Sequence, residues 1–400
     1  MVSVQDLREF VVGLVNLASK DVKAAEVLYG MGFLNQALYY IEQGSEKTVK
    51  ALFFSPCLCF QGFSNRDVST CYSEIAVDRK GNVVEDPDDF VRNVRHDPLK
   101  LFKHLLFIEP RMFASIYQKF HNIEIDKKLV LDITSAIYRD LGIESSLPES
   151  PREISDLGPE YIIKLLLELA SYISALFPAC SSEVLKSSRL CESRLCESVK
   201  RLDEEARKCE EAKNEDICLN LVNTMSEVFR SLSSLMLVKD VWRSLKLEEL
   251  LETPYIDDFL KSFEGFISRL KEELAKRTDP TTYRKTAKFI EQNIKPMVKC
   301  AITVAKLFVI TYTLFYLASP FYNLVRYPVS SKKLDICRDE SLRRIKKVEN
   351  LCNKSFISSE DVVAGETSIE EFIKIAVEAL KETVSNLKQM LNSIKTKQPM

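Results

Sequence analysis

Residues 32–52 read GFLNQALYYIEQGSEKTVKAL and predict one helix with two separate faces. At about 100° per residue, its apolar and small side chains gather in a stripe of the width that faces a helical core. The members of this stripe are Leu34, Leu38, Ile41, Ser45, Thr48, Val49 and Leu52. The opposite side carries Gln36, Gln43, Lys47 and Lys50. The stretch therefore predicts an amphipathic helix of an α-helical bundle.

The pattern extends outward from this helix in both directions. Residues 4–29 and 33–54 predict two antiparallel helices joined through Gly30 and Gly32, an αα-hairpin with a tight turn. The whole chain has 400 residues, 46% of them apolar and only 10 of them Gly, so it can bury a full core. Helical spacing of apolar residues recurs at 216–244, 255–276, 281–294 and 367–395. We therefore expect an all-α protein, an antiparallel helical bundle with additional helices.

Breaks in the helical pattern suggest how the chain is divided. Residues 74–84 alternate around Asp78-Arg79-Lys80-Gly81 and favour a short β-hairpin. The Ser- and Pro-rich stretch 142–151 is the best linker candidate. We expect a helical core in residues 1–140, an additional helical region in 141–295, and C-terminal helices in 296–400 that complete the core. One interrupted domain and two domains both fit this pattern.

The order of residues in the opening stretch resembles the second helix of HEPN domains. The matching elements are Gly-aromatic-x3-Ala-x-aromatic from Gly32, and then Glu-Gln-x2-Glu-Lys-x2-Lys-Ala from Glu42. Segments 24–31, 95–101 and 325–328 also look similar to archaeal-type members of this family. The resemblance implies a HEPN-like core, a homodimer with its cleft between protomers, and a role in RNA binding or in a defence or toxin–antitoxin system.

The ribonuclease motif of many HEPN domains, Arg followed by four to six residues and then His, is absent from this chain. Its three histidines, His96, His104 and His121, have no Arg at that spacing, and Arg92 lies one residue too close to His96. His can take a ribose hydroxyl proton and Arg can stabilise charge on a phosphate, so the catalytic candidates are His96, Arg92, Arg95 and Arg326. An enzyme built from them would be a metal-independent endoribonuclease.

Both of the stronger catalytic candidates also have a purely structural interpretation. Asp97-Pro98 after His96 is typical of a helix start, with Asp97 as the N-cap residue and Pro98 in the first turn. Arg326 before Tyr327-Pro328 is typical of a helix C-terminus.

The expected binding residues are Gln43, Glu46, Lys47, Lys50 and Tyr327. In one polar pocket, Gln43, Glu46 and Lys50 would meet Arg326 and His96. RNA or a nucleotide is the expected ligand. Because the ribonuclease spacing is missing, a non-catalytic nucleotide- or protein-binding module that pairs with a nucleotidyltransferase is the alternative. A membrane-associated helical protein is the second alternative, because residues 307–325 carry no charge. Lys299, Lys306 and Pro320 favour a buried core helix there, so we do not expect a membrane partner.

Charge and cysteine content narrow the remaining possibilities. The net charge of −2 argues against a basic surface over the whole chain, although a local basic patch is compatible with it. The spacing of the 11 Cys does not fit a zinc module, and no phosphate-binding glycine loop is present, so we expect neither a metal nor a cofactor. The chain opens as a helix rather than a secretion signal. We expect a cytoplasmic protein, with a composition that suits a hyperthermophilic archaeon.

Overall fold

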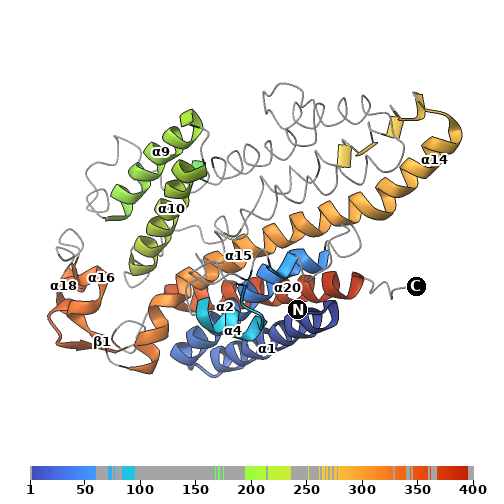
Figure 1. Ribbon diagram of the computed structural model, residues 1–400. Helices are drawn as coiled ribbons and strands as arrows, with labels where there is room; N and C mark the ends of the chain where they lie inside the picture. The colour runs from blue at the N-terminus through green and yellow to red at the C-terminus, as the bar shows by residue number, and fades with distance from the viewer. Residues whose placement is uncertain are drawn as a thin grey trace.

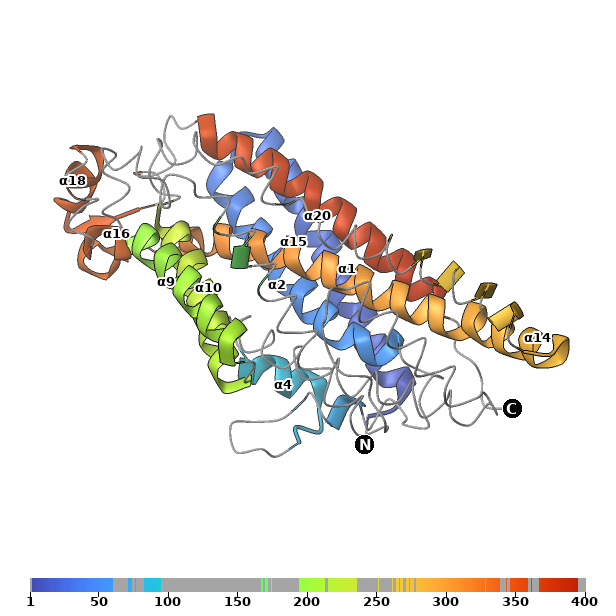
Figure 2. The same cartoon turned by 90° about the horizontal axis from the view of Figure 1, so that it is seen from above.

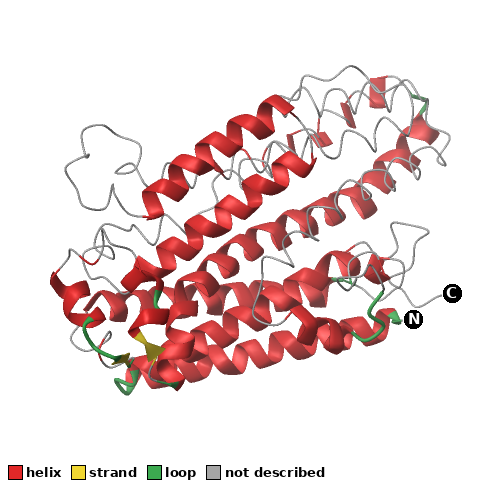
Figure 3. Ribbon diagram, turned by 60° about the vertical axis from the view of Figure 1, so that its left-hand side comes forward, coloured by secondary structure: helices red, strands yellow, loops and turns green. Residues whose placement is uncertain are grey.

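The computed structural model describes residues 2–59, 71–73, 83–94, 194–212, 215–235, 278–327, 329–338, 346–358 and 367–394, together with single residues and short pieces between them. These parts are almost entirely helical, as Figure 3 shows. The expectation of an all-α helical fold is confirmed.

The predicted αα-hairpin is present at the N-terminus. Helix α1 spans Val4–Gly30 and helix α2 spans Leu34–Cys59. Ser3 begins α1 with a capping box, in which its hydroxyl accepts from the Asp6 backbone N–H. Gly32 adopts a φ of 80°, which suits glycine, and the Phe33 N–H donates to the Leu28 carbonyl at 2.8 Å. The tight turn therefore brings the two helices together as expected.

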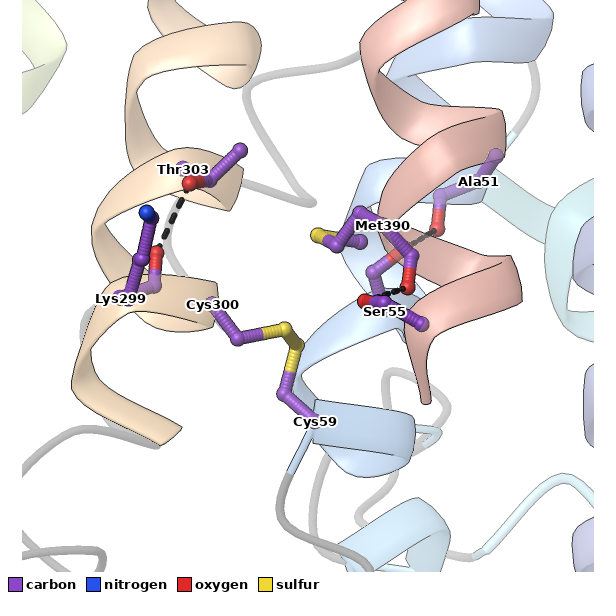
Figure 4. Close-up of a disulfide and its surroundings, with 8 residues drawn as sticks. Ala51, Ser55, Cys59, Lys299, Cys300, Thr303 and Met390 are labelled. Carbon is purple, nitrogen blue, oxygen red and sulfur yellow. Dashed lines mark hydrogen bonds between the residues drawn. A yellow bond between two sulfur atoms is a disulfide. The ribbon is translucent and has the colours of Figure 1, made fainter. Parts of the chain in front are cut away.

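Helix α2 continues past the point where the sequence predicts its end. The sequence pattern predicts an end at residue 54, yet the helix runs through Pro56, which lacks a backbone N–H, to Cys59. The Ser55 hydroxyl donates to the Ala51 carbonyl at 2.8 Å. Disulfides join Cys57 to Cys71 and Cys59 to Cys300. Figure 4 shows the Cys59–Cys300 bond, which joins the last turn of α2 to the helix that contains Cys300.

Two later helices, α15 (Lys295–Arg326) and α20 (Thr367–Ser393), pack against this hairpin. The guanidinium of Arg8 donates to the Leu391 carbonyl, and Lys381 pairs with Glu26, so α20 runs antiparallel to α1. Helix α2 contacts α1, α15 and α20, as Figures 1 and 2 illustrate. The central helix of the bundle is therefore the one that carries the HEPN-like residues.

One long helical rod replaces the two helices predicted around Pro296. Helix α14 (Pro280–Phe289) passes through a π-helical turn at Ile290–Ile294 directly into α15. In that turn the Lys295 N–H donates to the Ile290 carbonyl, five residues back. A π-turn adds room in the hydrogen-bond ladder just before Pro296, which cannot donate, so the rod continues without a break.

Outside the four-helix bundle lies a second helical hairpin, formed by α9 (Arg194–Ala212) and α10 (Glu215–Leu235). A disulfide between Cys209 and Cys218 closes its turn, and α10 packs on α15. A short helix, α4 (Pro87–Val94), follows the predicted β-hairpin. Of that hairpin, the described residues show the Val84 N–H donating to the Ala76 carbonyl at 2.7 Å.

A small substructure that the sequence analysis did not predict follows α15. It contains β1 (Val329–Ser330), a 3-10 turn (Ser331–Lys333), α16 (Asp335–Arg338), α18 (Lys346–Cys352) and β2 (Phe356–Ile357). The two strands pair antiparallel, Val329 opposite Ile357, and a disulfide joins Cys337 to Cys352. Two-residue strands give too little alternation to be read from sequence.

Helices α1 and α2 approach closely at Gly44, which gives a testable prediction. A Cβ atom at position 44 would lie 3.2 Å from Val22 Cγ2 and 3.6 Å from the Ala18 carbonyl oxygen. We expect Gly44→Val to lower the free energy of unfolding by roughly 1–3 kcal/mol, because overpacking pushes the helices apart. Gly13→Ala, where no atom lies within 4 Å, should instead raise it by up to about 1 kcal/mol. Urea denaturation measures both changes, and equal effects would contradict this packing.

Candidate functional site

A chain of polar contacts follows one side of α2 and reaches α1. The Lys47 ammonium donates to the Asp21 carboxylate at 2.6 Å and to the Gln43 side-chain oxygen at 3.3 Å. The Gln43 amide in turn donates to the Glu42 carboxylate at 2.8 Å. Together with the pair formed by Glu46 and Lys50, we call these six residues the α2 charge network.

The pair of Glu46 and Lys50 lies inside the bundle. Lys50 donates to the Glu46 carboxylate one helical turn earlier, and the side chains of Lys50 and Glu46 are only 11% and 9% exposed. The expectation that Lys50 lies opposite the core is therefore wrong. Because α1, α15 and α20 surround α2, the core is not confined to the Leu-rich stripe.

Glu42 is the most buried ionisable residue of the network. It is 1% exposed, and burial raises the pKa of its carboxyl to about 7. The neighbouring Glu46 also raises this pKa, whereas the Gln43 hydrogen bond and the charges of Lys47 and Lys50 lower it. A carboxyl that changes protonation near neutral pH inside a helical core is a candidate functional group by environment.

The raised pKa makes stability depend on pH. The pKa of Glu42 in the folded state, about 7, lies above the reference value of 4.5. The contribution of the protonated carboxyl to the free energy of unfolding is therefore complete below pH 4.5 and is lost as pH rises through about 7. We expect Glu42→Gln to leave stability nearly unchanged at pH 4.5 and to raise it by up to about 3 kcal/mol at pH 8. Denaturant titration across this range measures the difference. The control is Glu378→Gln at an exposed position of α20, and a pH-independent effect of Glu42→Gln would contradict the prediction.

Two further predicted site residues, Arg326 and Tyr327, lie at the end of α15. Helix α15 ends at Arg326, as the structural interpretation of this residue expects, and its guanidinium carbon lies 5.9 Å from the centre of the Tyr39 ring. Such a distance is within the range of a cation–π contact. Tyr327 follows with its side chain 67% exposed. Arg326 thus packs on Tyr39 near the start of α2, and the exposed Tyr327 follows it in sequence.

The predicted binding residues make two sets of described contacts, and their meeting in one pocket stays a prediction. Gln43, Glu46, Lys47 and Lys50 lie within the α2 charge network, whereas Arg326 and Tyr327 lie at the outer end of α15. Of the predicted catalytic residues, His96 and Arg95 lie outside the described parts of the chain. Arg92 lies on α4, of which only the backbone is described there.

Sequence reasoning missed Asp21, Tyr39 and Glu42 as members of these sites. Glu42, Glu46 and Lys50 follow one another at four-residue spacing, so they lie on one face of the helix. This spacing indicates side chains that can interact with one another. Asp21 and Tyr39 depend on contacts between helices, which no local pattern reveals.

Two further properties concern metals and membranes. Within the described ranges, no group of three or more His, Cys, Asp or Glu could hold a metal ion. One described helix is long and apolar enough to cross a membrane, at Ile302–Ser319, with a mean hydropathy of 1.6. Of this segment, 67% is buried inside the protein, as in a core helix.

Comparisons with protein-family models, with curated proteins and with solved structures find no match to this chain.

Proposed function

We propose that this chain is a HEPN-like helical protein that binds RNA, as in a defence or toxin–antitoxin system, without the usual HEPN ribonuclease motif. The observation that carries the proposal is the exposed pair of Arg326 and Tyr327 at the end of the core helix α15. A guanidinium binds phosphate through forked donors, and an aromatic ring stacks on a base. The central position of α2, which carries the HEPN-like residues, supports the family assignment.

The α2 charge network favours binding over catalysis. Its two lysines form ion pairs with carboxylates, Lys47 with Asp21 and Lys50 with Glu46. A lysine held in a buried ion pair is a poor partner for a transition-state phosphate, because leaving its carboxylate would cost several kcal/mol. The network therefore acts as a structural element in this proposal, and the RNA contacts lie at the end of α15.

The proposal includes the division of the chain and its assembly. The HEPN-like core comprises residues 1–140 and 296–400, with 141–295 as an additional region, and the packing of α15 and α20 on α1 and α2 supports this division. The protein forms a homodimer. A nucleotidyltransferase is the protein partner in the alternative, non-catalytic module.

The disulfides bear on where the protein works. Four pairs are present among the described cysteines, and such bonds are typical of oxidising compartments. Intracellular proteins of hyperthermophiles are the exception to this rule. The proposed cytoplasmic location therefore requires a host of that kind, and the disulfides otherwise point outside the cytoplasm.

Incubation of the purified protein with a mixed RNA pool in metal-free buffer tests the function. We expect RNA to be retained on a native gel and recovered at full length, and Arg326→Ala to weaken retention. Lys20→Ala, at an exposed position of α1, is the matched control for loss of one positive charge. Shortened RNA that is absent with His96→Ala would instead show a metal-independent endoribonuclease, and no retention at all would overturn RNA binding.

A further inference from the structure

Positive charge is concentrated just after α15. Residues 326–358 contain nine Lys or Arg and four Asp or Glu, whereas the whole chain has a net charge of −2. We call the described residues of this segment, 326–327, 329–338, 343 and 346–358, the basic cap. The cations of the whole segment are Arg326, Lys332, Lys333, Arg338, Arg343, Arg344, Lys346, Lys347 and Lys354, and the acids are Asp335, Asp339, Glu340 and Glu349. One of these cations, Lys354, is paired with Asp361, just beyond the segment. The sequence of this segment therefore fits the local basic patch that the balanced net charge leaves room for. Its sign fits a polyanionic partner.

Two of these cations are directly available to a ligand. Lys332 and Lys333 are both exposed, and neither side chain forms an ion pair with a described residue. They lie in the 3-10 turn between β1 and α16. Unlike Lys47 and Lys50, they can approach a phosphate without breaking an existing pair.

Aromatic rings flank the same lysines. Tyr327 is 67% exposed before β1, and Phe356 is 64% exposed on β2, where it lies opposite Ser330. The next residue, Ile357, is fully buried, so the alternation of the strand points Phe356 outward. Met31 and Phe33, 64% and 47% exposed, lie in the turn between α1 and α2. Figure 1 shows this turn at the same end of the molecule as β1. Tyr327 and Phe356 thus offer exposed aromatic rings before and after the two lysines in sequence, and an aromatic ring can stack on a base.

The basic cap is a firm support for these side chains. The Cys337–Cys352 disulfide and the β1–β2 pairing close it, and Ile336, Val348 and Ile357 are buried within it. The Arg338 guanidinium donates to the Lys332 carbonyl at 3.0 Å, which fixes the turn that carries both lysines. Binding would therefore require little ordering of the protein.

We infer that the basic cap is a binding surface for single-stranded RNA, with bases stacked on Tyr327 and Phe356 and with phosphates bound by Lys332 and Lys333. This inference rests on the proposed RNA binding and assigns its substrate class. The combination of exposed rings and free cations is what unpaired nucleic acid uses, because an unpaired base offers its face for stacking. An RNA duplex keeps its bases stacked internally and offers mainly phosphates and 2′-hydroxyls.

Fluorescence anisotropy of the full chain tests the inference, with a labelled single-stranded RNA and the same strand in a duplex. We expect Phe356→Ala to weaken single-strand binding roughly tenfold and to leave duplex binding nearly unchanged. The control for loss of an exposed apolar side chain is Leu17→Ala, 47% exposed on α1. The double variant Lys332→Ala/Lys333→Ala should reduce the slope of log affinity against log salt by about 1.4, since each phosphate contact on a single strand contributes about 0.7.

The control for that double variant is Lys20→Ala/Lys23→Ala, which removes two exposed lysines from α1. Equal binding of both RNAs, unchanged by either cap variant, would overturn the inference and leave RNA binding itself standing. Loss of all RNA binding by the wild type would overturn both. Binding of the wild type to vesicles rich in anionic lipid, in preference to RNA, would assign the cap to a membrane surface instead and contradict the inference.

Discussion

Lys50→Met is expected to destabilise the protein by roughly 3–5 kcal/mol, because it removes the Lys50 cation that pairs with the buried Glu46 carboxylate. The side chains of both residues are almost completely buried, so water cannot replace the lost partner. The double variant Glu46→Leu/Lys50→Met should recover the loss, since apolar residues of similar size often replace a buried ion pair at little cost. Guanidinium denaturation of the single and double variants measures both effects.

An exposed pair of the same kind provides the control. Lys381 and Glu26 join α20 to α1, and their side chains are 52% and 49% exposed. Lys381→Met should therefore cost less than about 1 kcal/mol. A Lys50→Met variant as stable as Lys381→Met would contradict the closed packing around α2.

Removal of the Cys59–Cys300 disulfide is expected to have the second largest effect. The two cysteines are separated by 241 residues in sequence, and the bond restricts the unfolded chain over that whole length. In the chain-entropy description a loop of this size corresponds to a loss of roughly 5 kcal/mol, and measured losses for native disulfides are about 2–5 kcal/mol. We therefore expect Cys59→Ala/Cys300→Ala to lower the free energy of unfolding by about 4 kcal/mol.

The short disulfide of the α9–α10 turn is the matched control. Cys209 and Cys218 are separated by 9 residues, and by the same description their removal should cost about 2.5 kcal/mol. Denaturation midpoints of the two double variants, each measured without reductant, test the difference. An equal or smaller effect for Cys59→Ala/Cys300→Ala would mean that the bond does not hold α2 to α15 in the folded protein.

Local pattern predicts much of the helical structure of this chain. The α1–α2 hairpin, the turn at Gly32 and the last helix, α20, follow from apolar spacing and from helix-terminating residues. Two helices continue past the predicted ends of their patterns, residue 54 before Pro56 and residue 294 before Pro296. In the first case burial and two disulfides sustain the helix, and in the second a π-turn accommodates the ring.

The candidate sites were harder to predict because they depend on which helices surround α2. The sequence places Lys47 and Lys50 on a polar side, but neighbours from distant parts of the chain convert that side into an internal network. Similarly, Arg326 is recognisable as a helix C-terminus, whereas its contact with Tyr39 needs the antiparallel packing of α15 on α2. Exposure of Phe356 follows only from the β1–β2 pairing, which has no sequence signal.

Ultraviolet cross-linking of the wild-type chain to single-stranded RNA, followed by mass spectrometric mapping of the linked peptides, tests the central claim most directly. The account predicts RNA attached to the peptides that contain Tyr327 and Phe356, with attachment lost when unlabelled single-stranded RNA is added in excess. Attachment confined to other surfaces, such as the α9–α10 hairpin, or no specific attachment to any peptide, would contradict it.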